Sequence, residues 1–227
     1  MSVDKIEQAL QPYGLKLRGI VTLNDDEIRQ YNFAGQLAVA LVGNIGSSFW
    51  SSFVESNEYA DGEADPLDRW SLRVANEVAP SLNAKPVFPF QGPPYLPFQQ
   101  WAKRAEAMHQ SPLGLMIHPQ FGLWHAYRFA LLFQHTFEQT QDNQESPCLS
   151  CIDQPCLKTC PVNALSAEGY DVDGCAEYLK QNASAECFEH GCMARFSCPA
   201  GREYRYLDAQ SQFHLGAFVG ARLNAGD

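Results

Sequence analysis

The first 147 residues of the chain contain no cysteine, and the sequence has no apolar run long enough to span a membrane. Its longest apolar runs, such as 37–42 and 129–133, fall far short of the roughly 20 residues that cross a bilayer. Long runs of Lys or Arg are also missing and the formal net charge is −10, so we expect no binding to nucleic acid or to a membrane surface. Residues 1–10 lack the apolar core of a signal peptide, which predicts a cytoplasmic protein.

All eight cysteines lie between Cys148 and Cys198, which divides the chain into two parts of different composition. The polar stretch 139–145, QTQDNQE, lacks apolar periodicity and is the expected boundary between them. An apolar content of 45% is ample for a packed core without disulfides. We therefore expect the following parts: a domain at 1–140, a cysteine-containing module at 146–208 and a C-terminal helix at 209–227 that packs back on the chain.

Apolar periodicity indicates both helices and strands in the first part. Pro66 after Asp65 begins a helix whose apolar stripe includes Trp70 and Val74. The run 37–42, LAVALV, is bounded by glycines and predicts a strand that is buried on both faces. Further helices are expected at 3–10, 98–109 and 209–223, and further strands at 15–22, 113–117 and 126–133. This alternation favours an α+β or α/β arrangement.

The spacing of the cysteines is the most informative pattern in the sequence. The first run is Cys148-x2-Cys151-x4-Cys156-x3-Cys160-Pro161, and the second is Cys175 followed by Cys187-x4-Cys192-x5-Cys198-Pro199. In two-cluster ferredoxin modules, three thiolates of one run bind one cluster and the cysteine before proline binds the other. The pattern therefore predicts two 4Fe-4S clusters, one held by Cys148, Cys151, Cys156 and Cys198, and the other by Cys160, Cys175, Cys187 and Cys192.

Eight thiols could also bind zinc or form disulfides. The ferredoxin spacing is x2-x2-x3, and residues 152–155 lengthen the first run by two. Two tetrathiolate zinc sites are the main alternative, but zinc ribbons usually need two C-x2-C pairs and this chain has one. Disulfides are not expected in a protein without a signal peptide and with a large apolar first part.

The order of motifs resembles two known families. From Cys148 onward, the C-x2-C run, the two Cys-Pro pairs and the lone Cys175 before a helix resemble the ferredoxin part of epoxyqueuosine reductase, an architecture shared with reductive dehalogenases. The first part resembles the cobalamin-processing protein CblC at 37–50, 65–82 and above all 117–132. The last stretch fits an I-H-P-x-F-G-x-W-x-x-x-R pattern.

The resemblance implies a flavin-reductase-like (nitroreductase-related) α+β sheet domain followed by a mostly irregular and helical ferredoxin-type module. It implies an iron-sulfur oxidoreductase in which two clusters reduce a corrinoid bound by the first domain. A redox partner protein is the expected electron donor to the clusters. One alternative is a cobalamin-trafficking and dealkylating protein. Another is a ferredoxin-like carrier whose first domain binds a flavin such as FMN or docks a partner.

The same resemblance supplies candidate cofactor-binding residues. Arg128 matches the family arginine near cobalamin, although an arginine here is equally typical of a structural ion pair. His118 could ligate cobalt, whereas a His-Pro at a strand end is more typical of a turn bonded to the backbone. Phe121, Gly122 and Trp124 are expected to shape the pocket wall. No residue is assigned as catalytic or as the proton donor.

Overall fold

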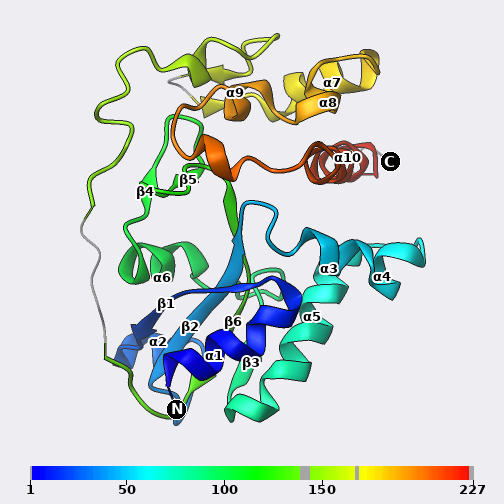
Figure 1. The fold of residues 1–227 in the computed structure, drawn as a ribbon. Coiled ribbons are helices and arrows are strands. Elements are labelled where there is room, and N and C mark those ends of the chain that lie inside the picture. Colours follow the sequence, from blue (N-terminus) through cyan, green and yellow to red (C-terminus); the bar gives the residue numbers. More distant parts are fainter. Residues whose placement is uncertain (1, 139–143, 167–168, 225–227) are drawn as a thin grey trace. The chain divides into compact units, whose positions relative to one another are not determined.

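The computed structural model describes residues 2–138, 144–166 and 169–224, so most of the predicted boundary at 139–145 lies outside the described residues. The chain forms two compact units (Figure 1). The first comprises Met1–Ala107 and His125–Gln144, and the second comprises Met108–Trp124 and Glu145–Asp227. Across the described ranges, no helix combines the length and the apolarity needed to span a membrane.

An antiparallel four-stranded sheet is the centre of the first unit. Its strands are β1 (Lys16–Thr22), β2 (Ala38–Ile45), β3 (Lys85–Val87) and β6 (His125–Phe133), in the order β1-β2-β6-β3. β2 pairs with both β1 and β6, and all of its residues from 38 to 44 are buried. This confirms the buried strand that the run 37–42 predicts.

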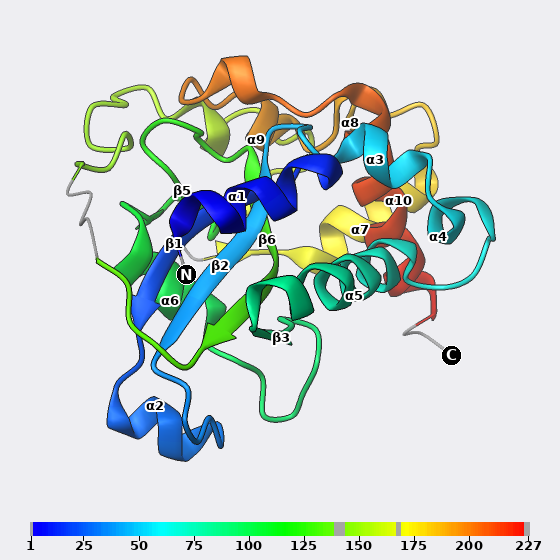
Figure 2. The same cartoon turned by 60° about the horizontal axis from the view of Figure 1, so that its bottom comes forward.

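Three helices of the first unit, α1 (Val3–Leu10), α5 (Pro66–Val78) and α6 (Phe98–Ala105), pack against this sheet. The other helices of this unit are α2 (Asp25–Gln30), α3 (Trp50–Val54) and α4 (Asn57–Ala60), with short 3-10 turns at Gln11–Tyr13 and Pro80–Leu82. α1 lies across β1 (Figure 2), and α5 contacts β6 through a buried stripe that includes Trp70 and Val74. The mixture of helices and open sheets confirms the α+β class, while the nitroreductase-like assignment stays a prediction.

A buried ion pair explains why α6 ends at Ala105 rather than near residue 109. Glu106 leaves the helix in an extended conformation and binds Arg18 of β1 through both carboxylate oxygens, at 2.9 Å each. The side chain of Arg18 is fully buried, and its Nη1 donates to the carbonyl oxygen of Asn44 at 3.1 Å. The Tyr127 hydroxyl donates to Glu106 at 2.7 Å, so every charged atom of the pair has a partner near it.

Substituting Tyr127 by phenylalanine is expected to lower the free energy of unfolding by about 1–3 kcal/mol, because it leaves a buried carboxylate oxygen short of a donor. Chemical denaturation followed by circular dichroism measures this. Tyr13→Phe is the matched control, since the Tyr13 hydroxyl donates to Glu77 in an exposed position and its loss should cost about 0.5 kcal/mol. Equal losses in the two variants would contradict the buried network.

The second unit combines short strands and helices with one long C-terminal helix. Its elements are β4 (His109–Gln110), β5 (Met116–Ile117), β7 (Leu165–Ser166), β8 (Gly169–Tyr170), α7 (Val172–Gln181), α8 (Cys187–His190), α9 (Met193–Phe196) and α10 (Asp208–Asn224), with 3-10 turns at Pro155–Leu157 and Arg202–Tyr204. α10 packs against α7 and α8. Leu215, Phe218 and Val219 of α10 pack against the buried cluster that includes Leu179 and Cys187.

The structure differs from the sequence analysis in the segment Met108–Trp124, which was assigned to the first domain and belongs to the second unit. The expected strand at 113–117 shortens to Met116–Ile117. The reason is a tight turn, in which the Gly114 amide donates to the Ser111 carbonyl at 3.0 Å and Gly114 has a φ of +74°. This turn joins β4 to β5 in an antiparallel hairpin.

Candidate functional site

Four cysteines from distant parts of the module line one small pocket. They are Cys148, Cys151, Cys156 and Cys198. Cys156 and Cys198 are buried, in a cluster with apolar side chains that include Leu113, Ile117 and Leu123. The cavity has a volume of about 20 Å³, which is the space of one or two water molecules.

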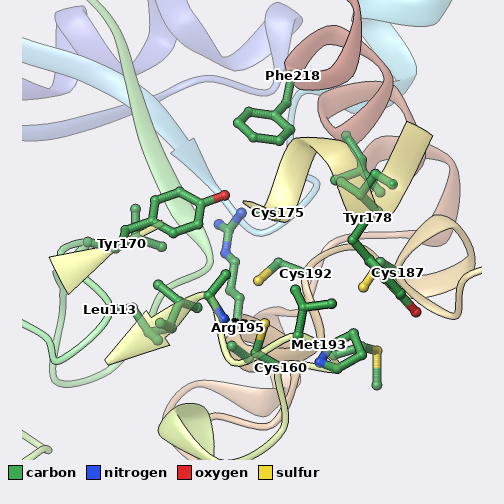
Figure 3. A pocket seen from close by; sticks show the side chains of 18 residues that line it. Leu113, Cys160, Tyr170, Cys175, Tyr178, Cys187, Cys192, Met193, Arg195 and Phe218 are labelled. Carbon is green, nitrogen blue, oxygen red and sulfur yellow. Dashed lines mark hydrogen bonds between the residues drawn. The ribbon is translucent and has the colours of Figure 1, made fainter. Parts of the chain in front are cut away.

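The other four cysteines line a second and wider pocket of about 240 Å³, shown in Figure 3. They are Cys160, Cys175, Cys187 and Cys192. Cys175 lies in α7, Cys187 begins α8, and Cys192 directly precedes α9. The Sγ of Cys160 accepts a hydrogen bond from the Ala164 amide at 3.3 Å. The eight cysteines therefore divide into the same two quartets that the ferredoxin logic predicts.

Burial and mutual proximity set the chemistry of these thiols. All eight cysteines are free. Burial raises the pKa of the Cys156 thiol, and the neighbouring Cys198, Cys151 and Cys148 raise that pKa further. In the second pocket, burial raises the pKa of Cys187, and Cys192 and Cys175 add to it. Thiolates gathered in this way repel one another, so each quartet is suited to a cationic centre that accepts four sulfur ligands.

A single zinc ion and a 4Fe-4S cluster require different spacings of their sulfur ligands. Zn–S bonds of about 2.3 Å hold four thiolates within roughly 4 Å of one another. Within the described ranges, no group of three or more His, Cys, Asp or Glu side chains lies close enough to hold a single ion. A 4Fe-4S cube takes one thiolate at each of four separate iron atoms, so its ligands stand farther apart. Four thiols in each pocket are the number of protein ligands that a 4Fe-4S cluster takes.

Two glycines bring the loop 118–124 against the chain that follows Cys198. A Cβ built on Gly122 would lie 2.1 Å from the carbonyl oxygen of Ala200, and one built on Gly201 would lie 2.3 Å from the carbonyl carbon of Phe121. Both glycines have positive φ, +57° and +66°. The two backbones touch directly, which places the 118–124 loop as a support for the first quartet.

Aromatic and cationic side chains complete this support. Phe121 lies edge-on to Tyr204 at 5.1 Å, and Trp124 lies edge-on to Tyr206 at 5.4 Å. The guanidinium of Arg195 lies 4.7 Å from the centre of the Trp124 ring and 4.5 Å from that of Tyr206. These contacts explain why residues 108–124 belong to the second unit.

His118 occupies a turn within this loop. Its Nδ1 accepts hydrogen bonds from the amides of Gln120 and Phe121, at 3.1 and 3.3 Å. Its ring stacks on Phe121 at 4.2 Å, and its backbone pairs with Gly122 in both directions at 2.9 Å. This geometry favours the turn role over cobalt ligation. Nδ1 accepts hydrogen bonds from the backbone, and in a neutral imidazole the proton is then on Nε2, which cannot bind a metal in that form.

The predicted corrinoid residues do not form one site within either unit. His118, Phe121, Gly122 and Trp124 lie in the second unit, packed on one another and on residues 199–206. Arg128 lies in the first unit on β6, with its guanidinium 5.8 Å from the Phe49 ring centre. Burial raises the pKa of Asp68, and the positive charge of Arg128 partly offsets this increase. This arrangement does not fit a corrinoid in the second unit, and the ligand stays a prediction.

The sequence analysis missed two polar groups beside the cysteines. The Tyr170 hydroxyl forms a hydrogen bond with the Cys175 sulfur. Tyr170 also lines the second pocket (Figure 3). Ser111 lines the first pocket from the β4–β5 turn. The Ser-Pro-Leu-Gly sequence signals the turn itself, but no local pattern reveals that it faces cysteines 37 or more residues away.

Fold and site together define an α+β protein with a small module that carries two quartets of free cysteines. No protein-family model matches the sequence, and no curated protein is similar to it at a significant level. Among solved structures, an epoxyqueuosine reductase with an epoxyqueuosine-modified tRNA-Tyr stem loop is 14% identical with a TM-score of 0.50. The alignment covers 91% of this chain and 68% of that one.

Two further epoxyqueuosine reductases are similar to the same extent. The Streptococcus thermophilus protein is 15% identical, with a TM-score of 0.50 and coverage of 87% of this chain and 65% of its own. The Bacillus subtilis protein is 12% identical, with a TM-score of 0.52 and coverage of 91% and 68%. At these identities the likeness shows a shared fold. It bears out the resemblance to epoxyqueuosine reductase at that level, whereas the CblC resemblance stays a prediction.

Proposed function

We propose that this chain is an iron-sulfur oxidoreductase whose two cysteine quartets each hold a 4Fe-4S cluster. The observation that carries the proposal is the division of eight free cysteines into two pockets of four. Such clusters take up and release single electrons, a reaction that amino-acid side chains do not supply. The fold shared with epoxyqueuosine reductases supports this assignment.

In this proposal the protein's own residues hold and shield the clusters. The thiolates neutralise iron, and the apolar wall of the first pocket excludes water from it. Tyr170 and Arg195 line the second pocket, and a hydroxyl donor and a nearby cation favour the more negative, reduced state of a cluster. An external redox protein is the proposed electron donor.

Protein made and purified without oxygen tests the proposal. We expect about eight iron atoms and about eight sulfides per chain, with broad visible absorbance that bleaches on reduction by dithionite. Zinc at about two atoms per chain without sulfide would instead support two tetrathiolate sites and would overturn the cluster assignment. The same samples, reconstituted with iron and sulfide, exclude simple loss of metal during purification.

The electron acceptor is a separate part of the proposal. A corrinoid bound by the first unit is the acceptor that the CblC resemblance implies. Titration of the iron-loaded protein with cobalamin tests this, and binding should displace the lower axial ligand and change the corrinoid absorbance. An unchanged spectrum at saturating protein would show that a corrinoid is not the acceptor. A titration with FMN is the parallel test for a flavin acceptor.

A further inference from the structure

Ser111 is a buried polar residue in the wall of the first cysteine pocket. It is 6% exposed, and its hydroxyl oxygen has no hydrogen-bond partner in the described part of the chain. Besides the cysteines, the only other polar side chain of that wall is the exposed Gln154. A buried hydroxyl without a partner is rare in native proteins and indicates a group that the site is built to receive.

The backbone of Ser111 is held firmly, which fixes where the side chain can reach. Its amide donates to the Leu115 carbonyl at 2.9 Å, and its carbonyl accepts from the Gly114 amide at 3.0 Å. Serine at the first position of a turn commonly bonds its own backbone two residues further on. Here the hydroxyl makes no such bond, so it remains available to the pocket that Cys148 and Cys156 line.

Resting on the proposed function, we infer that the Ser111 hydroxyl donates a hydrogen bond to a sulfur of the first cluster and raises that cluster's reduction potential. The physical reason is charge. An added electron increases the negative charge on the cluster sulfurs, so a donor stabilises the reduced state more than the oxidised state. Ser111 therefore tunes the reduction potential of the cluster and is not one of its ligands.

The potential of each cluster is measured separately by using ligand variants. Cys187→Ala is expected to retain only the first cluster, and Cys156→Ala only the second. In the Cys187→Ala background, Ser111→Ala should lower the equilibrium constant for one-electron reduction about tenfold, which is about 59 mV. In the Cys156→Ala background the same substitution should leave the potential unchanged. Redox titration followed by electron paramagnetic resonance reads both.

Three results would overturn the inference. One is an unchanged potential in the Cys187→Ala background, and another is an equal shift in both backgrounds, which indicates a general structural effect. If Ser111→Ala fails to hold the first cluster, Ser111→Thr decides, because it keeps the hydroxyl. A threonine variant that holds the cluster at the parent potential supports the inference, and one that also loses it shows that Ser111 acts by packing. Iron and sulfide missing from the unsubstituted chain would instead refute the proposed function.

Discussion

Replacing Cys156 with alanine should halve the iron content of anaerobically prepared protein, from about eight to about four atoms per chain. The reason is the division of the cysteines, since Cys156 lines only the first pocket. Removal of one of four thiolates leaves an iron atom without its protein ligand in a pocket whose other side chains, apart from Ser111, Gln154 and the remaining cysteines, are apolar. Iron and sulfide analysis, together with the electron paramagnetic resonance spectrum of the reduced protein, measures the loss.

Cys187→Ala is the matched variant, because Cys187 is equally buried, at 8% exposed, and lines only the second pocket. It should also retain about four iron atoms, with the spectrum of the other cluster. The two spectra should add up to that of the parent protein. Identical spectra from the two variants, or full iron content in either one, would contradict the assignment of the quartets.

Substituting Gly122 by alanine should destabilise the second unit by about 3–5 kcal/mol, from a strained positive φ and from forced displacement of packed backbone. The new Cβ would lie 2.1 Å from the Ala200 carbonyl oxygen, two residues from Cys198. Because that backbone cannot yield without moving Cys198, we expect the first cluster to be lost before the second. Denaturation monitored by circular dichroism and cluster absorbance measures both effects.

Gly114→Ala separates strain from steric clash. Gly114 also has a positive φ, +74°, but no atom lies within 4 Å of the position where its Cβ would be. Its substitution should cost about 1–2 kcal/mol and should leave the iron content unchanged. A Gly122→Ala variant that resembles Gly114→Ala in stability and iron content would show that the contact between the two backbones is not essential.

Patterns that depend on neighbours in the sequence predicted much of the fold. The stripe of α5 and the uninterrupted apolar run of β2 are local signals, and both elements form where they were expected. The Cys-Pro logic also anticipated which cysteines share a pocket, because Cys-x-x-Cys spacing and the crossing fourth ligand are properties of the module itself.

Contacts between distant segments were not predictable in the same way. The pattern around Gly122 resembles a cofactor-binding motif. In the structure, the absence of a side chain at Gly122 lets the backbone of Ala200, 78 positions later, come into contact. The unpartnered hydroxyl of Ser111 is likewise visible only when burial and the distant cysteines are known. Helices α8 and α9 are four residues each, too short to leave an apolar periodicity.

The backbone passes from one unit to the other three times, after Ala107, after Trp124 and after Gln144. No single cut therefore releases an intact cysteine module, since a fragment that starts at residue 145 lacks the hairpin and the loop that support its first quartet. Expression of 145–227 alone should yield a protein that binds the second cluster at most. The two units therefore have to be expressed and engineered together.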